Sequence, residues 1–414
     1  MIIYKTIKLT LFMIYKHIPQ DFEVNELYDL DSITKEDEGH GKIYYYFILE
    51  KTNYTQIKSL EKVANIFKVR RDDIHFAGTK DRAGITRQLI SVKGIKKHTF
   101  ENNITFFNNR LGPDLKLDFI GRYHSRVSLG DNLGNNFVIT LRDLSREEVD
   151  LARSAVKKIA RLGVLNYFDE QRFGYAGNSH TIGKYVLKND LESAVREILF
   201  SLPPTPREEF VVWVNKIKEN WDEIKNQNQV LISSIIKSAP KFYQNECRML
   251  RHLHDHKNDF PGAFRVIHKK LRTLYVNAYQ SYLFNEVLAS FEKTQERNLS
   301  EVSGVSFNCV LDRLDVLPDE IELMHESIDT STSYGIIYQE IFKKDGLSLE
   351  NFGFISMPEL KQDFVSRKTR VFPSDFKIHF GSDDDLFQNK NKLIISFSLE
   401  SGAYATNVIK QLLN

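Results

Sequence analysis

The stretch Phe76-Ala-Gly-Thr-Lys-Asp-Arg-Ala-Gly-Ile-Thr-Arg-Gln88 places one carboxylate, that of Asp81, between two cations on a glycine-flanked turn. The apolar residues before this turn and the alternating apolar residues after it predict two strands that the turn connects. Catalytic groups collect on such connections, because a rigid scaffold holds them. Lys80 and Arg82 favour the ionised form of Asp81, which suits nucleophilic attack or proton abstraction. A turn aspartate that caps its own backbone is the competing interpretation, and the spacing alone favours it.

The length of the chain predicts two domains, and its composition is typical of a soluble globular protein. It has 414 residues, more than the roughly 250 to 300 at which single hydrophobic cores stop growing. Its net charge is only +2, so any binding to a polyanion must depend on local basic clusters. Each such cluster is more often a solvated face than a binding site. The clusters are Lys93, Lys96 and Lys97; Lys269, Lys270 and Arg272; and Arg367, Lys368 and Arg370.

Cysteine usage and the apolar segments indicate an intracellular protein. Cys247 and Cys309 are too far apart for a metal knuckle, and two cysteines make no disulfide framework. Lysines interrupt the apolar run in residues 1–16, so we expect an N-terminal strand there and not a signal peptide. No apolar stretch reaches the ~18 residues that a membrane span requires. We therefore expect a cytoplasmic location, or a nuclear one if the source is eukaryotic, and no membrane partner.

Residues 1–162 show strand and helix patterns in alternation, which predicts a mixed α+β domain. One helix is predicted over residues 54–67, with capping signals at Asn53 and Thr55. A helical period returns over residues 151–161 and is ended by Gly163. We place a domain boundary close to this glycine.

The remainder of the chain is mainly helical in pattern, with strand patterns near its end. Three prolines in residues 201–206 require an extended loop. The longest predicted helix covers residues 263–291, which carry a one-face apolar stripe. Strand patterns resume after residue 303, and the chain ends in a predicted strand over residues 393–399 and a helix over residues 404–413.

The Asp81 segment resembles the signature of the TruD family of pseudouridine synthases, in which Ala-Gly-Thr-Lys-Asp-Arg precedes Thr-x-Gln. Further blocks resemble the family's other motifs in the same order, and together they cover nearly the whole chain. They are Lys16-His-Ile-Pro-Gln-Asp-Phe-Glu-Val-Asn-Glu26, Gly134-Asn-Asn-Phe137, Asn166-Tyr-Phe-Asp-Glu-Gln-Arg-Phe-Gly174, Ala278-Tyr-Gln-Ser-Tyr-Leu-Phe-Asn285 and Ser396-Phe-Ser-Leu-Glu-Ser-Gly-Ala-Tyr-Ala-Thr406. Two positions depart from the pattern: Asp169 replaces a common glycine, and Arg87 replaces a small polar residue.

The resemblance implies an α+β fold with a mixed, mainly antiparallel pseudouridine synthase sheet, flanking helices, and an inserted α/β domain peculiar to TruD. The catalytic domain is expected in residues 1–162 and 370–414, and the inserted domain in residues 163–369. Periodicity alone does not predict that the two ends of the chain join in one sheet.

The resemblance also implies an isomerase that converts uridine to pseudouridine in RNA, with tRNA as the substrate and uridine 13 as the usual target. The implied partner is tRNA or another structured RNA, with no obligatory protein partner. No cofactor and no metal ion are implied, because the isomerisation changes no oxidation state and consumes no water.

By the same resemblance, Asp81 matches the family's catalytic aspartate. The reaction cleaves the N1–C1′ bond, turns the uracil and rejoins it through C5. Asp81 could add at C1′ or remove the 2′ proton, and the sequence leaves both roles open. The uracil must leave its stack to reach the carboxylate, which requires a pocket of aromatic faces and polar edges.

The resemblance assigns five residues to that pocket. Taken alone, Phe22 and Phe137 would more often be core residues. We expect Lys16 to pair with Asp81, and Asn135 to bind the carboxylate or the edge of the base. The five matching positions are Lys16, Phe22, Asn135, Phe137 and Tyr404.

Two other functions stay open. A non-catalytic RNA-binding or RNA-chaperone protein could keep this fold, although the presence of Asp81 argues against it. A metal-dependent RNA hydrolase could use His252, His254 and His256, two of which are four residues apart, but no acid or cysteine has recognisable ligand spacing. A solvated polar helix is the favoured interpretation of these histidines.

Overall fold

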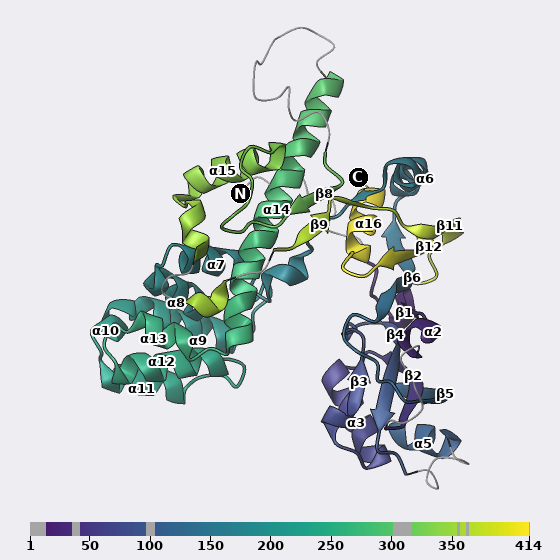
Figure 1. Cartoon of the computed structure of the whole chain (residues 1–414), viewed down its shortest axis with the longest axis horizontal. Coiled ribbons are helices and arrows are strands. Elements are labelled where there is room, and N and C mark those ends of the chain that lie inside the picture. Colours follow the sequence, from purple (N-terminus) through teal and green to yellow (C-terminus); the bar gives the residue numbers. More distant parts are fainter. Residues whose placement is uncertain are drawn as a thin grey trace. The chain divides into compact units, whose positions relative to one another are not determined.

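The computed structural model describes residues 14–34, 42–96, 104–300, 317–353, 357–361 and 364–413. The chain forms two compact units (Figure 1). Both ends of the chain build the first unit, Met1–Val164 with Arg370–Asn414, and Leu165–Thr369 forms the second. The first boundary between the two units thus lies after residue 164, and the sequence predicted it after residue 162. Cys309 and most of the expected N-terminal strand lie outside the described residues.

The first unit is built on one mixed sheet with the strand order β11-β12-β6-β1-β4-β2-β5, and β3 pairs with β4. Among the described strands, β1 and β4 are parallel and the other pairs are antiparallel. The C-terminal hairpin β11–β12 joins β6, so both ends of the chain share this sheet and the expected fold class is confirmed. The strands are β1 (Phe22–Tyr28), β2 (Tyr44–Thr52), β3 (Ile74–Phe76), β4 (Ile85–Lys93), β5 (Leu115–Tyr123), β6 (Asn132–Leu144), β11 (Ser374–Asp383) and β12 (Asn391–Glu400).

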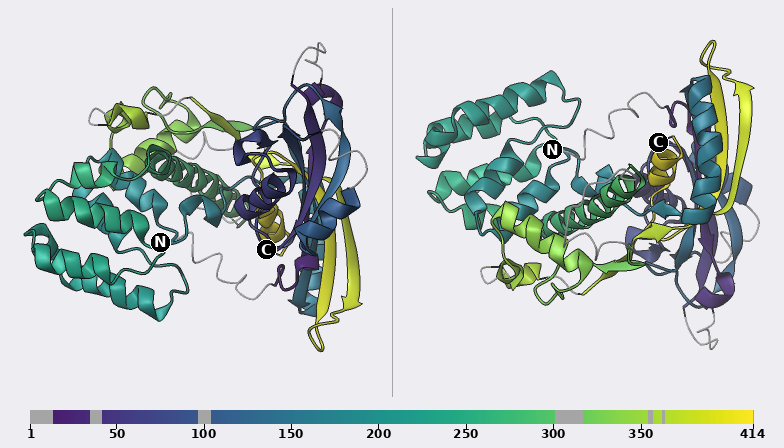
Figure 2. Two further views of the ribbon diagram at one scale, coloured as in Figure 1. Left: turned by 90° about the horizontal axis from the view of Figure 1, so that it is seen from below. Right: turned by 90° about the horizontal axis from the view of Figure 1, so that it is seen from above.

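Helices cover the sheet of the first unit in two groups (Figure 2). α3 (Gln56–Phe67) and α5 (Ile104–Leu111) bury apolar side chains against β2, β4 and β5 in one core cluster. α6 (Arg146–Leu162) and α16 (Ala405–Leu412) do the same against β1, β6 and β12 in a second cluster. A short helix, α2 (Leu30–Thr34), follows β1.

Local sequence explains where these helices begin and end. Ser145 caps α6, because its hydroxyl accepts a hydrogen bond from the Glu148 N–H at 3.2 Å and the Glu148 carboxylate accepts one from the Ser145 N–H at 2.8 Å. Gly163 ends this helix with a positive φ of 69°. The helical period at residues 151–161 therefore belongs to a helix that begins earlier, and the predicted helix over residues 54–67 is α3.

The second unit is mainly helical in its described part, with one small antiparallel sheet of β8 (Glu320–Glu322) and β9 (Ser366–Lys368). The chain enters through β7 (Val164–Leu165) and leaves through β10 (Arg370–Val371). The proline-rich residues 201–206 lie between helices, as predicted. The helices are α7 (Ser179–Leu187), α8 (Leu191–Leu199), α9 (Glu208–Glu219), α10 (Trp221–Lys225), α11 (Gln229–Lys237), α12 (Gln244–Asp255), α13 (Phe260–Arg265), α14 (Lys269–Ser300) and α15 (Ser333–Asp345).

The predicted helix over residues 263–291 is wrong at its start. α13 ends at Arg265 and the long helix α14 begins at Lys269. The imidazole of His268 accepts a hydrogen bond from the Lys270 N–H at 3.3 Å, so it competes with continuous helical pairing at the break. An apolar stripe does not reveal such a cap. Among the described residues, no helix is long and apolar enough to cross a membrane.

Candidate active site

One face of the sheet in the first unit carries most of the residues that the sequence singles out. Residues that pair across neighbouring strands point to the same face. The registers place Val24 opposite both Thr86 and Phe137. They also place Lys51 opposite Thr86, and Phe397 opposite Phe137. One row of this face therefore crosses five strands, from β2 to β12.

Two more of the expected site residues lie on this face, because alternate residues of a strand share a face. In β1, the buried positions are Phe22, Val24 and Glu26. Asn135 pairs with Glu26 in the register between β1 and β6. Phe22, Asn135 and Phe137 are therefore brought to the same side of the sheet.

Residues 77–84 connect β3 to β4 and carry Asp81 past β1. Lys80 anchors this loop, because its ammonium lies 2.5 Å from the Glu26 carboxylate and the two side chains are 6% and 0% exposed. The second carboxylate oxygen of Glu26 accepts a hydrogen bond from the Leu89 N–H at 2.9 Å. Both charges of the buried pair thus have partners, as buried charges require.

Gly84 allows the end of the loop to lie directly against the main chain of β1. Its φ is +100°, and a Cβ at this position would lie 2.2 Å from the carbonyl oxygen of Phe22. Glycine is therefore required here on two counts. The Gly84 N–H donates to the Asn53 side-chain oxygen at 3.0 Å, and its carbonyl accepts from the Asn53 N–H at 2.9 Å. These contacts fix the end of the loop that carries Asp81.

The Asp81 carboxylate is accessible and has a cationic partner. Its side chain is 43% exposed, and the Lys16 ammonium lies 3.5 Å from its Oδ2 atom. The expected Lys16–Asp81 pair is therefore present. Lys16 also lies 4.0 Å from the centroid of the Phe22 ring, a cation–π distance. The Asp81 carboxylate, the Lys16 ammonium and the Phe22 ring are thus neighbours on this face of the sheet.

Lys51 contacts Asp81 through the main chain. Its ammonium donates a hydrogen bond to the Asp81 carbonyl oxygen. The residue is 0% exposed. Burial lowers the pKa of Lys51 to about 8, an effect that the Asp81 charge opposes and the Lys80 charge reinforces. This lysine is not among the residues that the sequence motifs single out.

Two of the three expected aromatic residues, Phe22 and Phe137, belong to the core beneath this place. Phe22 and Phe137 are 4% and 7% exposed, and their ring centroids are 6.2 Å apart. Phe137 also packs against Phe397, with centroids 5.5 Å apart. The structure therefore places them in the apolar cluster of β1, β6 and β12, with Phe22 next to Lys16.

Asn135 makes no hydrogen bond to the Asp81 carboxylate. Its side-chain oxygen is buried and has no hydrogen-bond partner among the described residues. A buried amide oxygen without a partner is costly, so it is a candidate contact for a ligand. The expected contact of Asn135 with the edge of the base stays a prediction.

Tyr404 is partly buried and stands at the N-terminal cap of α16. It follows β12, whose last residue, Glu400, pairs with Gly134. A Cβ on Gly134 would lie 2.1 Å from the Leu399 carbonyl oxygen, so the two strands approach closely here. The segment with Tyr404 thus leaves the sheet next to Asn135.

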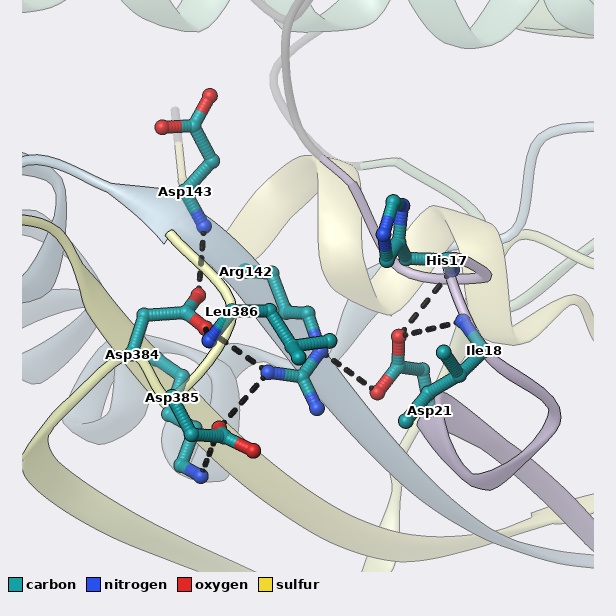
Figure 3. Close-up of polar contacts among 9 residues, drawn as sticks. His17, Ile18, Asp21, Arg142, Asp143, Asp384, Asp385 and Leu386 are labelled. Atoms are coloured by element: carbon teal, nitrogen blue, oxygen red, sulfur yellow. Dashed lines mark hydrogen bonds and ion pairs between the residues drawn. The ribbon is translucent and has the colours of Figure 1, made fainter. Parts of the chain in front are cut away.

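A buried ionic network holds the segment that carries Lys16 (Figure 3). The Arg142 guanidinium at the end of β6 donates to Asp21 at 2.8 Å and to Asp384 at 2.8 Å. These three side chains are 5%, 1% and 0% exposed. Arg142 also donates to the exposed Asp385 at 2.9 Å. Residues from the N-terminal segment, β6 and the β11–β12 hairpin therefore meet at one cation.

The network reaches Lys16 through Asp21. The second carboxylate oxygen of Asp21 accepts hydrogen bonds from the N–H groups of His17 and Ile18, at 3.1 and 3.0 Å. These two residues follow Lys16 directly. Arg142 holds Asp21, and Asp21 holds the turn from which Lys16 extends towards Asp81.

The sequence contains a signal for Lys51 but hardly one for Arg142. In β2, Tyr45, Phe47 and Leu49 are buried at alternate positions, and Lys51 continues this series. A lysine in the inward phase of an apolar strand is unusual and could have been singled out. Arg142 gives no such signal, because its partner Asp384 is 242 residues away.

The histidine cluster and Arg87 have structural partners. His252 pairs with Asp259 and His254 with Asp255, both at 2.7 Å. Within the described ranges, no group of three or more potential ligands is arranged to hold a metal ion. Arg87 contacts Glu23 and Glu50 at 3.0 and 2.5 Å, on the sheet face opposite Asp81.

Comparisons with known proteins agree with this geometry. The family model of tRNA pseudouridine synthase D (TruD) matches residues 1–303 and 322–412. The chain is 30% identical to the probable tRNA pseudouridine synthase D 2 of Methanocaldococcus jannaschii, over 97% of this chain and 91% of that protein. It is also 30% identical to a probable tRNA pseudouridine synthase D of Methanopyrus kandleri, over 89% and 84% of the two chains.

A solved structure is similar as well. The crystal structure of the putative tRNA pseudouridine synthase D of Methanosarcina mazei superimposes with a TM-score of 0.73 at 25% identity, covering 96% of this chain and 93% of that one. Fold and sequence thus define an enzyme of the isomerase class, a pseudouridine synthase. Within that class, the chain belongs to the tRNA pseudouridine synthase D (TruD) family.

The Arg142 network predicts a large effect on stability. Arg142→Met should lower the free energy of unfolding by about 3 to 5 kcal/mol, because it leaves two buried carboxylates without their cation. Urea denaturation measures this change. Arg153→Met is the matched control: it removes an exposed arginine that lies 3.7 Å from Asp150, and it should cost at most about 0.5 kcal/mol. Equal losses in the two variants would contradict the assignment.

Proposed function

We propose that this enzyme isomerises uridine to pseudouridine in tRNA, with uridine 13 as the target and Asp81 as the single catalytic carboxylate. The observation that carries the proposal is the placement of Asp81, 43% exposed, with the Lys16 ammonium 3.5 Å from its carboxylate. Membership of the family supports the substrate class, because the matching family model and relatives are described as tRNA pseudouridine synthases.

One carboxylate suffices for the chemistry. Cleaving the N1–C1′ bond leaves positive charge on the sugar, and Asp81 can either add at C1′ or remove the 2′ proton. The uracil then turns and C5 attacks C1′, which either displaces the Asp81 carboxylate from C1′ or is accompanied by return of the proton to C2′. C5 loses its proton and N1 gains one, so atoms and electrons balance without any co-reactant. Lys16 supplies a fixed countercharge for the carboxylate.

The target base must leave its stack to reach Asp81, which costs a few kcal/mol. Lys16, Phe22, Asn135, Phe137 and Tyr404 are our candidates for binding it. The Asn135 oxygen lacks a partner among the described residues, so it can accept a hydrogen bond from the N3–H group of uracil. The rings of Phe22 and Phe137 provide an aromatic floor.

The proposal is tested by the product. The protein should be incubated with an unmodified tRNA transcript, and pseudouridine should be mapped by chemical derivatisation. We expect one new pseudouridine, at position 13, and none in a transcript with cytidine there. Pseudouridine at another position would refute the choice of uridine 13 alone, whereas unchanged RNA from a folded protein would refute the proposed activity.

Lys16 gives a second prediction. Lys16→Met should slow the single-turnover rate about 10- to 100-fold, as expected when a charged partner worth ~1.5 to 3 kcal/mol is removed. Affinity for tRNA should change much less. The control is Lys116→Met, which removes an exposed lysine that lies 2.9 Å from Asp118, and it should react at the wild-type rate. A Lys16 variant as fast as this control would exclude the ion pair from the reaction.

A further inference from the structure

Lys51 is an unusual feature of the first unit, because its side chain is fully buried at the end of β2. Lysines are almost never fully buried unless they are paired. The acceptor of its ammonium is a main-chain oxygen, the carbonyl of Asp81. The bond joins residues that are 30 positions apart, one in the sheet and the other in the loop.

The loop has an anchor on each side of Asp81 and would be free to turn between them. Lys80 is held by Glu26 on one side, and Gly84 is held by Asn53 on the other. Ala83 and Arg82 in between are exposed. The Lys51 bond is a third anchor, at the main chain of the reacting residue itself.

The charges that face Lys51 come from the loop. The Asp81 charge favours the protonated form of Lys51, whereas burial and the Lys80 charge disfavour that form. Burial has the largest effect, so the pKa of Lys51 is lowered to about 8. Glu26, which could have compensated, is bonded to Lys80 and to the Leu89 N–H. Lys51 therefore changes its charge within the range in which enzymes are assayed.

We propose that Lys51 is a positioning residue, whose ammonium fixes the Asp81 main chain so that the carboxylate keeps its reactive orientation. A charge-assisted hydrogen bond is about twice as strong as a neutral one, so deprotonation weakens this anchor. The inference rests on the proposed function, in which Asp81 is the reacting group. Lys51 touches neither substrate nor carboxylate in this assignment.

Above about pH 8, the proposal predicts opposite changes in the reaction rate and in the Lys51 contribution to stability. The folded pKa of Lys51 lies below its unfolded value, so deprotonation favours the folded state and its contribution to stability rises from about pH 8 towards about pH 10.5. The single-turnover rate should fall around the folded pKa of about 8, because deprotonation weakens the anchor. An unfolding artefact would lower both together.

The test compares Lys51→Met and Lys51→Arg with the wild type in single-turnover assays from pH 6.5 to 9.5. Lys51→Met should be about 100-fold slower at pH 7, the cost of misplacing a reacting group by about 1 Å, with tRNA affinity within about threefold. Lys51→Arg keeps its charge at all these pH values, so its rate should not show the alkaline fall. If deprotonation of uracil caused the alkaline fall in rate, the fall would appear in every variant.

A matched control is Lys62→Met, because the Lys62 ammonium also donates to a main-chain oxygen, that of Leu111, at 3.0 Å. Lys62 lies in α3, and this variant should keep the wild-type rate and pH profile. Amide hydrogen exchange gives a readout that does not depend on activity. Exchange in residues 77–84 should increase at least tenfold in Lys51→Met and should be unchanged in Lys62→Met.

The outcomes distinguish the inference from the proposed function. Wild-type protein that forms no pseudouridine would refute the function, whereas hydrogen exchange would still test the Lys51 anchor. If neither Lys51 variant folds, wild-type exchange in residues 77–84, corrected for its intrinsic pH dependence, should rise between pH 7 and 9.5. A Lys51→Met rate within twofold of wild type, or unaltered exchange in this loop, would overturn the proposal.

Discussion

The first unit depends on the buried guanidinium of Arg142. Its carboxylate partners lie 121 residues before it and 242 residues after it, so one cation ties the N-terminal segment to the C-terminal hairpin. Taking three charged groups out of water is unfavourable, and the ion pairs repay that cost only with good geometry and satisfied hydrogen bonds. Both conditions hold here, since Asp384 also accepts hydrogen bonds from the N–H groups of Asp143 and Leu386.

Buried groups around the Asp81 loop explain how an accessible carboxylate can be held in a fixed position. Asp81 itself is exposed, but three groups that fix its position are buried: the Lys80–Glu26 pair, the Gly84 main chain and Lys51. Buried ion pairs add little net stability compared with apolar packing, so we interpret these pairs as means of fixing geometry. Preorganisation of this kind lets one charged group act without rearrangement during the reaction.

The sequence predicted those features that depend on near neighbours. Asp81 lies between two strands, and Gly163 ends a helix. The Lys16–Asp81 pair joins residues 65 positions apart, and the family resemblance predicted it. Periodicity failed at the break before α14, where one imidazole caps a new helix. Lys51 and Arg142 were missed for another reason. A burial pattern can indicate that a residue points inwards, but it does not identify a partner that is distant in the sequence.

The claim that one carboxylate carries the chemistry is tested most directly by Asp81→Asn in a single-turnover reaction at saturating enzyme. The amide keeps the size of the side chain but can neither attack C1′ nor remove a proton, so pseudouridine should fall below detection. Because the side chain is 43% exposed, the thermal melt should stay near that of the wild type, and tRNA should still bind. Pseudouridine formed by this folded variant at a rate near that of the wild type would contradict the account.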